Sequence, residues 1–363
     1  MSALYRKYRP QKFSDLLGQS DLVTVMINTT KLDRFAHAYI FYGTRGTGKT
    51  SVARLVAKTA NCTDLEYKKK HGEACDACDA CMKINQGVTL DIFEIDGASN
   101  RGIDEIRELK EKIRVSPAFL RYKIFIIDEA HMLTTPAWNA LLKVFEEPPA
   151  HAIFILATTE FEKIPKTILS RAQRYFFKPQ GIKEISEKLL TITKEEKINA
   201  DKDALELIAT FADGSFRDAE SLLDQLRSLA PTLTKDVIEE ALGRLGPASI
   251  RELALAICKN DLKNSLALVK KYARDGVNFP DLIRELIELL RLALTLHLAP
   301  ALESDLIVDF GETESAIIKE LATLCLPEKI SPLLKGLIAA YEESGTTPFP
   351  QLSLELALIE NIK

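Results

Sequence analysis

An eight-residue run near the start of the sequence carries the clearest chemistry. Residues 43–50 read GTRGTGKT and match the phosphate-binding pattern G-x-x-x-x-G-K-[ST]. In such a loop, backbone N–H groups surround a polyphosphate, and the next helix points its positive N-terminal end at the same anion. The lysine reaches the β- and γ-phosphates, and the last hydroxyl binds Mg²⁺. We therefore expect a nucleoside triphosphate to be bound by Gly43, Thr44, Arg45, Gly46, Thr47, Gly48, Lys49, Thr50 and Ser51, with Thr50 as a Mg²⁺ ligand.

A pair of carboxylates follows an apolar run further along the chain. Residues 123–131 read KIFIIDEAH. Asp128, at the end of the expected strand, can hold Mg²⁺ through water, and Glu129 can polarise the water that attacks the γ-phosphate. Taken alone, the pattern also fits a strand that ends in an acidic turn. Beside an intact phosphate-binding loop, it predicts the hydrolytic half of a nucleotide site.

Two threonines and two arginines are further candidates for the same site. The run IFILATTE ends in Thr158 and Thr159, and a hydroxyl there can sense the γ-phosphate or position the water. Arg171 follows a proline-bounded segment, and Arg217 lies in the first turn of an expected helix. Each arginine alone fits an ordinary surface position. In this combination either can stabilise transition-state charge, one from a neighbouring chain and one from the same chain.

Four of the six cysteines have the spacing of a metal site, Cys62-x12-Cys75-x2-Cys78-x2-Cys81. Three thiolates three residues apart can converge on one ion, and a fourth ligand completes a tetrahedral structural zinc site. We prefer Cys62 as this ligand, with His71 in reserve. An iron–sulfur cluster is the competing interpretation, but the usual x3-Cys-Pro continuation is missing after Cys81. Cysteines without a metal are the third alternative.

An α/β scaffold has to bring these residues together. The first half of the chain alternates short apolar runs with helical patterns, which is typical of a parallel sheet covered by helices. Polar, glycine-containing or acidic residues follow each strand candidate, so we expect the chemistry at the carboxyl ends of the strands. The candidates are residues 38–42, 91–95, 123–127 and 152–157, with a last short strand at 176–177.

The second half of the chain is predicted to be helical. From residue 181 onward the strand signals disappear, and apolar residues recur at helical spacing. The expected helices of the first module are residues 182–193, 201–212, 217–229 and 235–242. Gly243–Pro247 indicates a junction before the remaining helices. In that last part, apolar residues at 282, 286, 289, 290, 293 and 296 form one wide face, which is either a domain core or a self-association surface.

Bulk properties narrow the class of protein. A length of 363 residues suggests two or three domains. The net charge of −4 gives no global basic field, so nucleic-acid contact needs a local basic face or an assembly. The first ten residues are too polar for a signal peptide, and charged residues interrupt the apolar stretch at 282–298. We therefore expect a cytoplasmic protein with no membrane span.

The ordered set of motifs resembles one family. YRKYRPQKFSDLLGQ, GTRGTGKTS, the CxxCxxC insertion, IIDEAH, LLKVFEEPP, LATTE, ILSR and GSFRDAESLLDQ occur in this order. The set is similar to the gamma/tau subunits of bacterial DNA polymerase III, which are AAA+ ATPases and motor subunits of the sliding-clamp loader. The resemblance covers essentially the whole chain, because PQLSLELALIEN is similar to the end of the family's third domain.

The resemblance implies a three-domain organisation. An α/β P-loop AAA+ domain, with a parallel sheet and helices on both faces, would occupy residues 1–179 and carry a zinc insertion at about 62–81. An α-helical lid would follow at residues 180–242, and an α-helical collar, or oligomerisation, domain at residues 243–363.

It also implies roles for matched residues. Thr159 matches the first sensor position, with Thr158 as the neighbouring alternative. Arg171 matches the arginine finger presented to the next subunit's ATP, and Arg217 matches the second sensor within its own subunit. The segment that lines the adenine side of the pocket contributes Tyr8, Arg9, Pro10 and Gln19.

The implied activity is that of an ATP-driven motor that loads the clamp onto primed DNA. ATP, Mg²⁺ and Zn²⁺ would be its cofactors. Its partners would be delta and delta-prime subunits, further gamma/tau copies, the sliding clamp and primer–template DNA, in the cytoplasm at the nucleoid. Alternatives are a non-hydrolysing ATP-binding scaffold of the same complex, which Glu129 and Arg171 disfavour, and another AAA+ ATPase of DNA repair or recombination.

Two departures from the family pattern are visible. Ala172 stands where the family has cysteine, but Arg171 beside it is kept. The sequence also stops where long family members continue into segments that contact the helicase and the polymerase. We therefore expect a short, gamma-like form without those two tethering functions.

Overall fold

Two compact units make up the chain. The computed structural model describes residues 3–100, 102–243, 245–324 and 326–362. One unit comprises Met1–Lys197 with Ile208–Gln225, and the other comprises Ile198–Leu207 with Leu226–Lys363. The boundaries predicted at residues 179/180 and 242/243 stay predictions. None of the described helices is both long and apolar enough to cross a membrane.

A parallel sheet forms the centre of the first unit. In the described residues its five strands have the order β2-β3-β4-β1-β5. They are β1 (Ala38–Gly43), β2 (Ile92–Asp96), β3 (Lys123–Asp128), β4 (Ala152–Thr158) and β5 (Gln173–Phe177). The five predicted strands are thus confirmed, and β5 begins three residues before the predicted start. Asp96 pairs with Asp128, and Tyr42 pairs with Thr158, so the carboxyl ends of neighbouring strands lie level.

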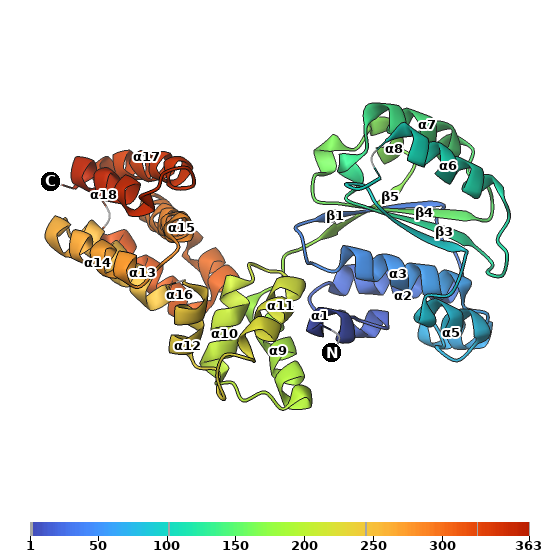
Figure 1. The fold of residues 1–363 in the computed structure, drawn as a ribbon, viewed down its shortest axis with the longest axis horizontal. Helices are drawn as coiled ribbons and strands as arrows, with labels where there is room; N and C mark the ends of the chain where they lie inside the picture. Colours follow the sequence, from blue (N-terminus) through green and yellow to red (C-terminus); the bar gives the residue numbers. More distant parts are fainter. Residues whose placement is uncertain (1–2, 101, 244, 325, 363) are drawn as a thin grey trace. The chain divides into compact units, whose positions relative to one another are not determined.

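Helices cover both faces of this sheet. Figure 1 shows α2 and α3 on one face and α6, α7 and α8 on the other. Because successive side chains of a strand point to opposite faces, Tyr39 and Phe41 pack with Val56 of α3, whereas Ile40 packs in the cluster that contains Leu141 of α7. Strands buried on both faces have continuous apolar sequences, which explains why their positions could be predicted.

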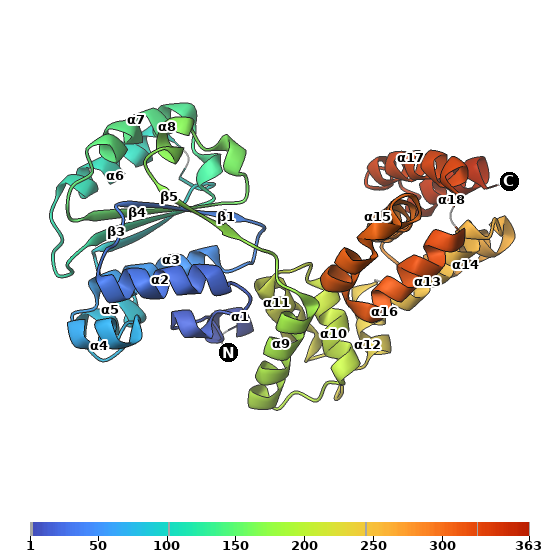
Figure 2. The ribbon, with the colours of Figure 1, turned by 180° about the vertical axis from the view of Figure 1, so that it is seen from behind.

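The helices of the first part of the chain connect the strands or precede them. Figure 2 shows α4 and α5, which carry part of the cysteine insertion, on the same side of the sheet as α2 and α3. The α-helices are α1 (Leu4–Lys7), α2 (Ser20–Leu32), α3 (Lys49–Asn61), α4 (Leu65–His71), α5 (Asp79–Gln86), α6 (Ile103–Arg114), α7 (Thr135–Glu146) and α8 (Lys166–Leu169). Short 3-10 turns are η1 (Phe13–Asp15), η2 (Ala130–Met132) and η3 (Phe161–Lys163).

The described residues beyond β5 form helices, as predicted. The first module contains α9 (Ile182–Glu196), α10 (Lys202–Phe211), α11 (Phe216–Leu226) and α12 (Lys235–Leu242). The rest comprises α13 (Pro247–Cys258), α14 (Leu262–Arg274), α15 (Phe279–Leu298), η4 (Pro300–Leu302), α16 (Glu303–Leu324), α17 (Pro327–Ser344) and α18 (Pro350–Asn361).

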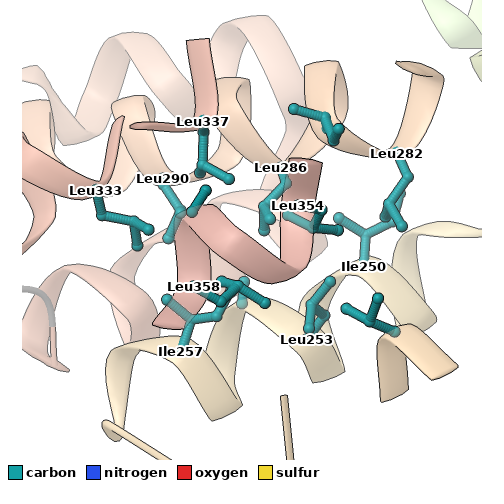
Figure 3. Close-up of a cluster of buried hydrophobic side chains, with 14 of the residues drawn as sticks. Ile250, Leu253, Ile257, Leu282, Leu286, Leu290, Leu333, Leu337, Leu354 and Leu358 are labelled. Atoms are coloured by element: carbon teal, nitrogen blue, oxygen red, sulfur yellow. The ribbon is translucent and has the colours of Figure 1, made fainter. Parts of the chain in front are cut away.

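The apolar face of α15 is the core of the second unit. Leu282, Leu286 and Leu290 are buried and pack with α17 and α18, whose Leu337 and Leu354 belong to the same cluster (Figure 3). The core interpretation of this face is therefore correct, and the stripe does not support self-association. A different apolar set is exposed on the last two helices: Ile338, Tyr341, Leu352, Leu356 and Ile359.

The position of Leu286 makes its contribution to stability measurable. The side chain is fully buried, and removing it leaves a cavity that the surrounding helices only partly fill. We expect Leu286→Ala to lower the free energy of unfolding by about 2–5 kcal/mol in urea denaturation followed by circular dichroism. Leu298, at the end of the same helix, has a side chain that is 66% exposed. Leu298→Ala therefore serves as the control and should change the free energy of unfolding by at most about 0.5 kcal/mol. Equal effects of both substitutions would contradict the assignment of the core.

Candidate functional site

A cavity of about 360 Å³ in the first unit contains most of the predicted nucleotide-site residues. Its size is in the range of small-molecule sites. Four stretches line it. They are the N-terminal segment (residues 5–19) with Tyr5, Arg9, Pro10, Asp15, Leu16, Leu17 and Gln19; the loop residues 45–51; the strand ends with Asp96, Asp128 and Glu129; and the helical module with Lys188, Phe216, Arg217 and Glu220.

The phosphate loop, residues 43–50, has the backbone that its glycines allow. Gly48 has a φ of 100° and precedes α3, whose described first turn contains no acidic residue. The positive end of this helix is therefore not neutralised by a side chain of that turn. Gly46 has a φ of 77°, and a Cβ atom there would lie 1.8 Å from Oγ of Ser215. The loop thus packs against the start of α11 in a way that only glycine permits.

Lys49 is held by its own loop. Its Nζ donates hydrogen bonds to the carbonyl oxygens of Gly43 at 2.9 Å and Thr44 at 2.7 Å. Burial lowers the pKa of Lys49, while the charges of Glu129 and Asp128 act in the opposite direction. An anion in the cavity would favour the ammonium form further. Gly43 and Thr44 themselves hold the lysine and do not line the cavity.

Thr50 and Asp128 form the geometry expected for a Mg²⁺ site. Oγ1 of Thr50 donates a 2.7 Å hydrogen bond to Oδ2 of Asp128. The two oxygens therefore lie side by side at the end of β3, and Mg²⁺ prefers hard oxygen ligands of this kind. Oδ1 of the same carboxylate accepts a 3.0 Å hydrogen bond from the backbone N–H of Glu129, which fixes its orientation.

Glu129 combines an unusual backbone with an unsatisfied side chain. Its φ is 46°, in the left-handed region that non-glycine residues rarely adopt. Such a conformation costs about 1–3 kcal/mol and is concentrated at functional sites. Among the described residues, Oε2 of Glu129 is buried without a hydrogen-bond partner, and it lies 3.6 Å from Nδ1 of His131. A buried acceptor of this kind can take a hydrogen bond from water or ligand in the cavity.

His131, which the sequence interpretation did not single out, lies beside Glu129 but is not among the residues that line the cavity. Its Nδ1 lies 3.1 Å from Oγ1 of Thr158, and its Nε2 lies 3.1 Å from Oε1 of Glu160. The side chain thus connects the end of β4 to the loop after β3. Its place two residues after Glu129 was the available signal. Thr159, the predicted sensor, is exposed and does not line the cavity, whereas Thr158 is buried.

The helical module completes the cavity through Arg217 and an ion pair. The Arg217 guanidinium lies 5.0 Å from the centre of the Tyr5 ring. Nζ of Lys188 lies 2.7 Å from Oε1 of Glu220, and burial raises the pKa of Glu220. The sequence interpretation missed Tyr5, Lys188 and Glu220. Tyr5 occurs in the motif that drew attention to Tyr8, and Glu220 occurs in the motif GSFRDAESLLDQ that drew attention to Arg217, but Lys188 belongs to no motif.

The predicted adenine-side residues divide into two groups. Arg9, Pro10 and Gln19 line the cavity, and Gln19 also donates a 2.8 Å hydrogen bond from Nε2 to the carbonyl oxygen of Lys178. Tyr8 is outside the lining; its hydroxyl donates to Oε1 of Glu196 at 2.9 Å.

Arg171 is not among the residues that line the cavity. It follows α8, where its guanidinium donates to the carbonyl oxygen of Thr167 at 2.7 Å and lies 3.2 Å from Oε1 of Glu146. Both charged side chains are more than one-third exposed, so this ion pair is weak and can exchange partners.

The four cysteines predicted as metal ligands come together. Their sulfur atoms all lie within 4.8 Å of one another, and the group, within the described residues, does not include His71. A tetrahedral zinc–thiolate site has sulfurs roughly 3.8 Å apart, so the donor set fits Zn²⁺. The N–H of Cys75 donates to Sγ of Cys62 at 3.4 Å, and the N–H of Cys78 donates to Sγ of Cys75 at 3.3 Å. These bonds stabilise the thiolate form that a metal requires.

The fold is shared with a solved structure. The Thermotoga maritima RuvB Holliday junction branch migration motor aligns with a TM-score of 0.50 and 18% identity, over 75% of this chain and 86% of that one. At this identity the likeness shows the fold alone.

Three protein-family models match consecutive parts of the chain. Residues 18–181 match "DNA polymerase III, delta subunit", and residues 184–228 match "DNA polymerase III clamp loader subunit, ATPase lid domain". Residues 233–363 match "DNA polymerase III subunits gamma and tau domain III".

Curated relatives agree with these matches. The chain is 39% identical to DNA polymerase III subunit tau of Bacillus subtilis and 37% identical to subunit tau of Escherichia coli, and covers 62% and 54% of their lengths. It is 35% identical to DNA polymerase III subunit gamma of Buchnera aphidicola subsp. Baizongia pistaciae, over 98% of this chain and 95% of that protein. The chain belongs to the family of DNA polymerase III gamma/tau subunits.

Proposed function

We propose that this protein is an ATP-hydrolysing motor subunit of a bacterial sliding-clamp loader, which loads the clamp onto primed DNA during replication. The observation that carries the proposal is the single cavity that joins the phosphate loop, Asp128, Glu129 and Arg217. Membership of the gamma/tau family supports it. A match to a clamp-loader ATPase lid model over residues 184–228 adds to this support.

The residues of the cavity have separate roles in the proposed reaction. Lys49 exchanges its two carbonyl partners for oxygens of the β- and γ-phosphates. Thr50 and Asp128 would hold Mg²⁺, which would supply positive charge beside the phosphates. Glu129 orients the attacking water through its buried oxygen, and Arg217 contacts the γ-phosphate from the helical module.

The remaining predicted residues have supporting roles. Thr159 stays the proposed first sensor, although the hydrogen bond to His131 draws attention to its neighbour Thr158. The proposed adenine side comprises Tyr8, Arg9, Pro10 and Gln19, of which the last three line the cavity.

Arg171 is proposed to act on the ATP of a neighbouring subunit. Its exposed position and weak ion pair are consistent with that role, because the guanidinium is accessible from outside the chain. The partners would be delta and delta-prime subunits, further gamma/tau copies, the sliding clamp and primer–template DNA, in the cytoplasm at the nucleoid. Conformational work would come from the different affinities of the assembly's states for ATP and ADP.

A non-hydrolysing scaffold of the same complex is the main alternative. The left-handed backbone of Glu129 favours hydrolysis, and so does its buried Oε2, which has no hydrogen-bond partner among the described residues, because a scaffold has no need of either. Family membership disfavours a different AAA+ ATPase of DNA repair or recombination. Measuring ATP turnover with clamp and primed DNA separates motor from scaffold.

We propose that Cys62, Cys75, Cys78 and Cys81 bind one structural Zn²⁺. Four protein ligands leave no open coordination position, so the ion would contribute to folding and take no part in hydrolysis.

Substitutions of Lys49 and Glu129 should impair different steps, ATP binding in the first case and ATP hydrolysis in the second. Lys49→Ala should abolish ATP binding in fluorescence titration with a labelled nucleotide. Glu129→Gln keeps the shape of the side chain, so it should leave binding intact and slow hydrolysis by about 10²–10⁴-fold. Glu162→Gln, an exposed carboxylate outside the cavity, is the control and should change neither. Equal losses of affinity in the first two variants would refute these roles.

Mixing variants tests the action of Arg171 between subunits. Arg171→Ala and Lys49→Ala chains, each inactive alone, should recover part of the stimulated ATPase rate together. One chain then supplies the intact pocket and the other supplies the guanidinium. Absence of recovery in mixtures whose chains co-elute on size exclusion would show that the site is complete within one chain.

Metal analysis tests the cysteine cluster. Purified protein should contain about one zinc per chain. Cys78→Ser should lose the metal and become sensitive to proteolysis near residues 62–81, whereas Cys258→Ser, outside the cluster in α13, should keep it. Iron with visible absorbance, or no metal at all, would rule out the zinc site.

A further inference from the structure

The N-terminal segment and the phosphate loop contribute side chains of different chemistry to the lining of the nucleotide cavity. The N-terminal segment contributes Pro10, Leu16 and Leu17 to the lining, and these apolar side chains suit a planar base. The phosphate loop contributes N–H groups and Lys49, which suit phosphates. The two ends of a nucleotide are therefore expected to depend on different parts of the chain.

A buried glutamate connects the cysteine insertion to the N-terminal segment. Glu73, two residues before Cys75, is only 6% exposed. Its carboxylate accepts hydrogen bonds from the backbone N–H groups of Phe13 at 3.0 Å and Ser14 at 2.8 Å. Hydrogen bonds to a charged acceptor are stronger than neutral ones. They hold the turn η1, directly before Leu16, against the insertion.

A buried lysine makes a second connection. Nζ of Lys58 donates to the carbonyl oxygen of Gln11 at 2.8 Å and lies 2.6 Å from Oδ1 of Asp76. Lys58 is on α3, the helix that starts at the phosphate loop. Asp76 lies between two of the cysteines and has a φ of 58°, so the turn around the metal site fixes its position. One ammonium group thus joins α3, the cysteine loop and the residue that follows Pro10.

We propose that the metal-binding insertion sets the affinity of the cavity for the base end of the nucleotide, with Lys58, Glu73 and Asp76 as positioning residues. The inference rests on the proposed ATP binding. When the cysteine loop is folded, Glu73 and Asp76 are fixed, and they hold residues 11–14 in place. When the loop is unfolded, the buried Lys58 ammonium loses its carboxylate partner, and the backbone N–H groups of Phe13 and Ser14 lose their acceptor. The N-terminal segment then leaves its position. None of the hydrogen bonds described for Lys58, Glu73 and Asp76 involves residues 43–50, so the phosphate loop keeps its conformation.

Comparing two ligands separates the two ends of the site. Affinities of the full-length protein for ATP and for inorganic tripolyphosphate, both with Mg²⁺, can be measured by isothermal titration calorimetry. We expect Glu73→Gln and Lys58→Met to weaken ATP binding by about tenfold, as for a lost charged hydrogen bond, and to leave tripolyphosphate binding unchanged. Zinc content should stay at the wild-type level in Glu73→Gln, because the ligands are intact.

Lys68→Met is the matched control. Lys68 is also buried and also in the insertion, but its Nζ bonds Oδ1 of Asp33 at 2.7 Å, at the far end of α2. This variant should lose stability without a change in either affinity. The inference would be wrong if both test variants kept the wild-type affinity for ATP, or if they lost affinity for ATP and tripolyphosphate to the same extent. It would also be wrong if Lys68→Met lost as much ATP affinity as the test variants. Wild-type protein that binds neither ligand would instead refute the proposed function.

Thermodynamic linkage between ATP binding and zinc binding allows an independent test of the inference. If the folded metal site favours ATP binding, ATP must favour metal binding by the same factor. Zinc affinity of the full-length protein, measured by competition with a chelator, should therefore rise about tenfold in the presence of a non-hydrolysable ATP analogue but not with tripolyphosphate. Equal zinc affinities under all three conditions would show that the insertion and the cavity are independent.

Discussion

The parallel register of the five described strands is the constraint on which the candidate nucleotide site depends. Because parallel strands end at the same edge of a sheet, the loops after β1 and β3 reach one cavity although Lys49 and Asp128 are far apart in the sequence. A one-residue slip of β3 would turn its side chains to the opposite face and separate Asp128 from Thr50. The apolar contacts on both faces prevent that slip, so the packing of the sheet and the geometry of the site have the same origin.

Much of the fold and site could be predicted because the relevant signals are local. A strand buried on both faces is apolar throughout, a phosphate-binding loop has its glycines and lysine at fixed spacing, and cysteines that share a metal are close in sequence. The strands, the phosphate loop, the acidic pair and the cysteine cluster all follow from such signals. The same holds for the helices after β5.

The features that sequence did not reveal depend on contacts between distant segments. His131 acquires its partners only when β4 is beside β3, and Lys188 meets Glu220 only when α9 packs against α11. Tyr5 and Tyr8 share one motif, yet only the first lines the cavity. The apolar stripe of α15 was ambiguous for the same reason. Periodicity indicates that one face of the helix is covered, but only the packing of α17 and α18 identifies the segments that cover it.

The hydrogen bonds of Lys49 to its own loop have a consequence for selectivity. Any anion that enters the cavity must displace two carbonyl oxygens from the ammonium group, so binding begins with the loss of two hydrogen bonds. Chloride or a single phosphate can form only a few new interactions to replace these hydrogen bonds. A polyphosphate replaces both acceptors and also engages the loop N–H groups and the helix terminus. The hydrogen bonds of Lys49 therefore favour a polyphosphate over small anions of lower charge.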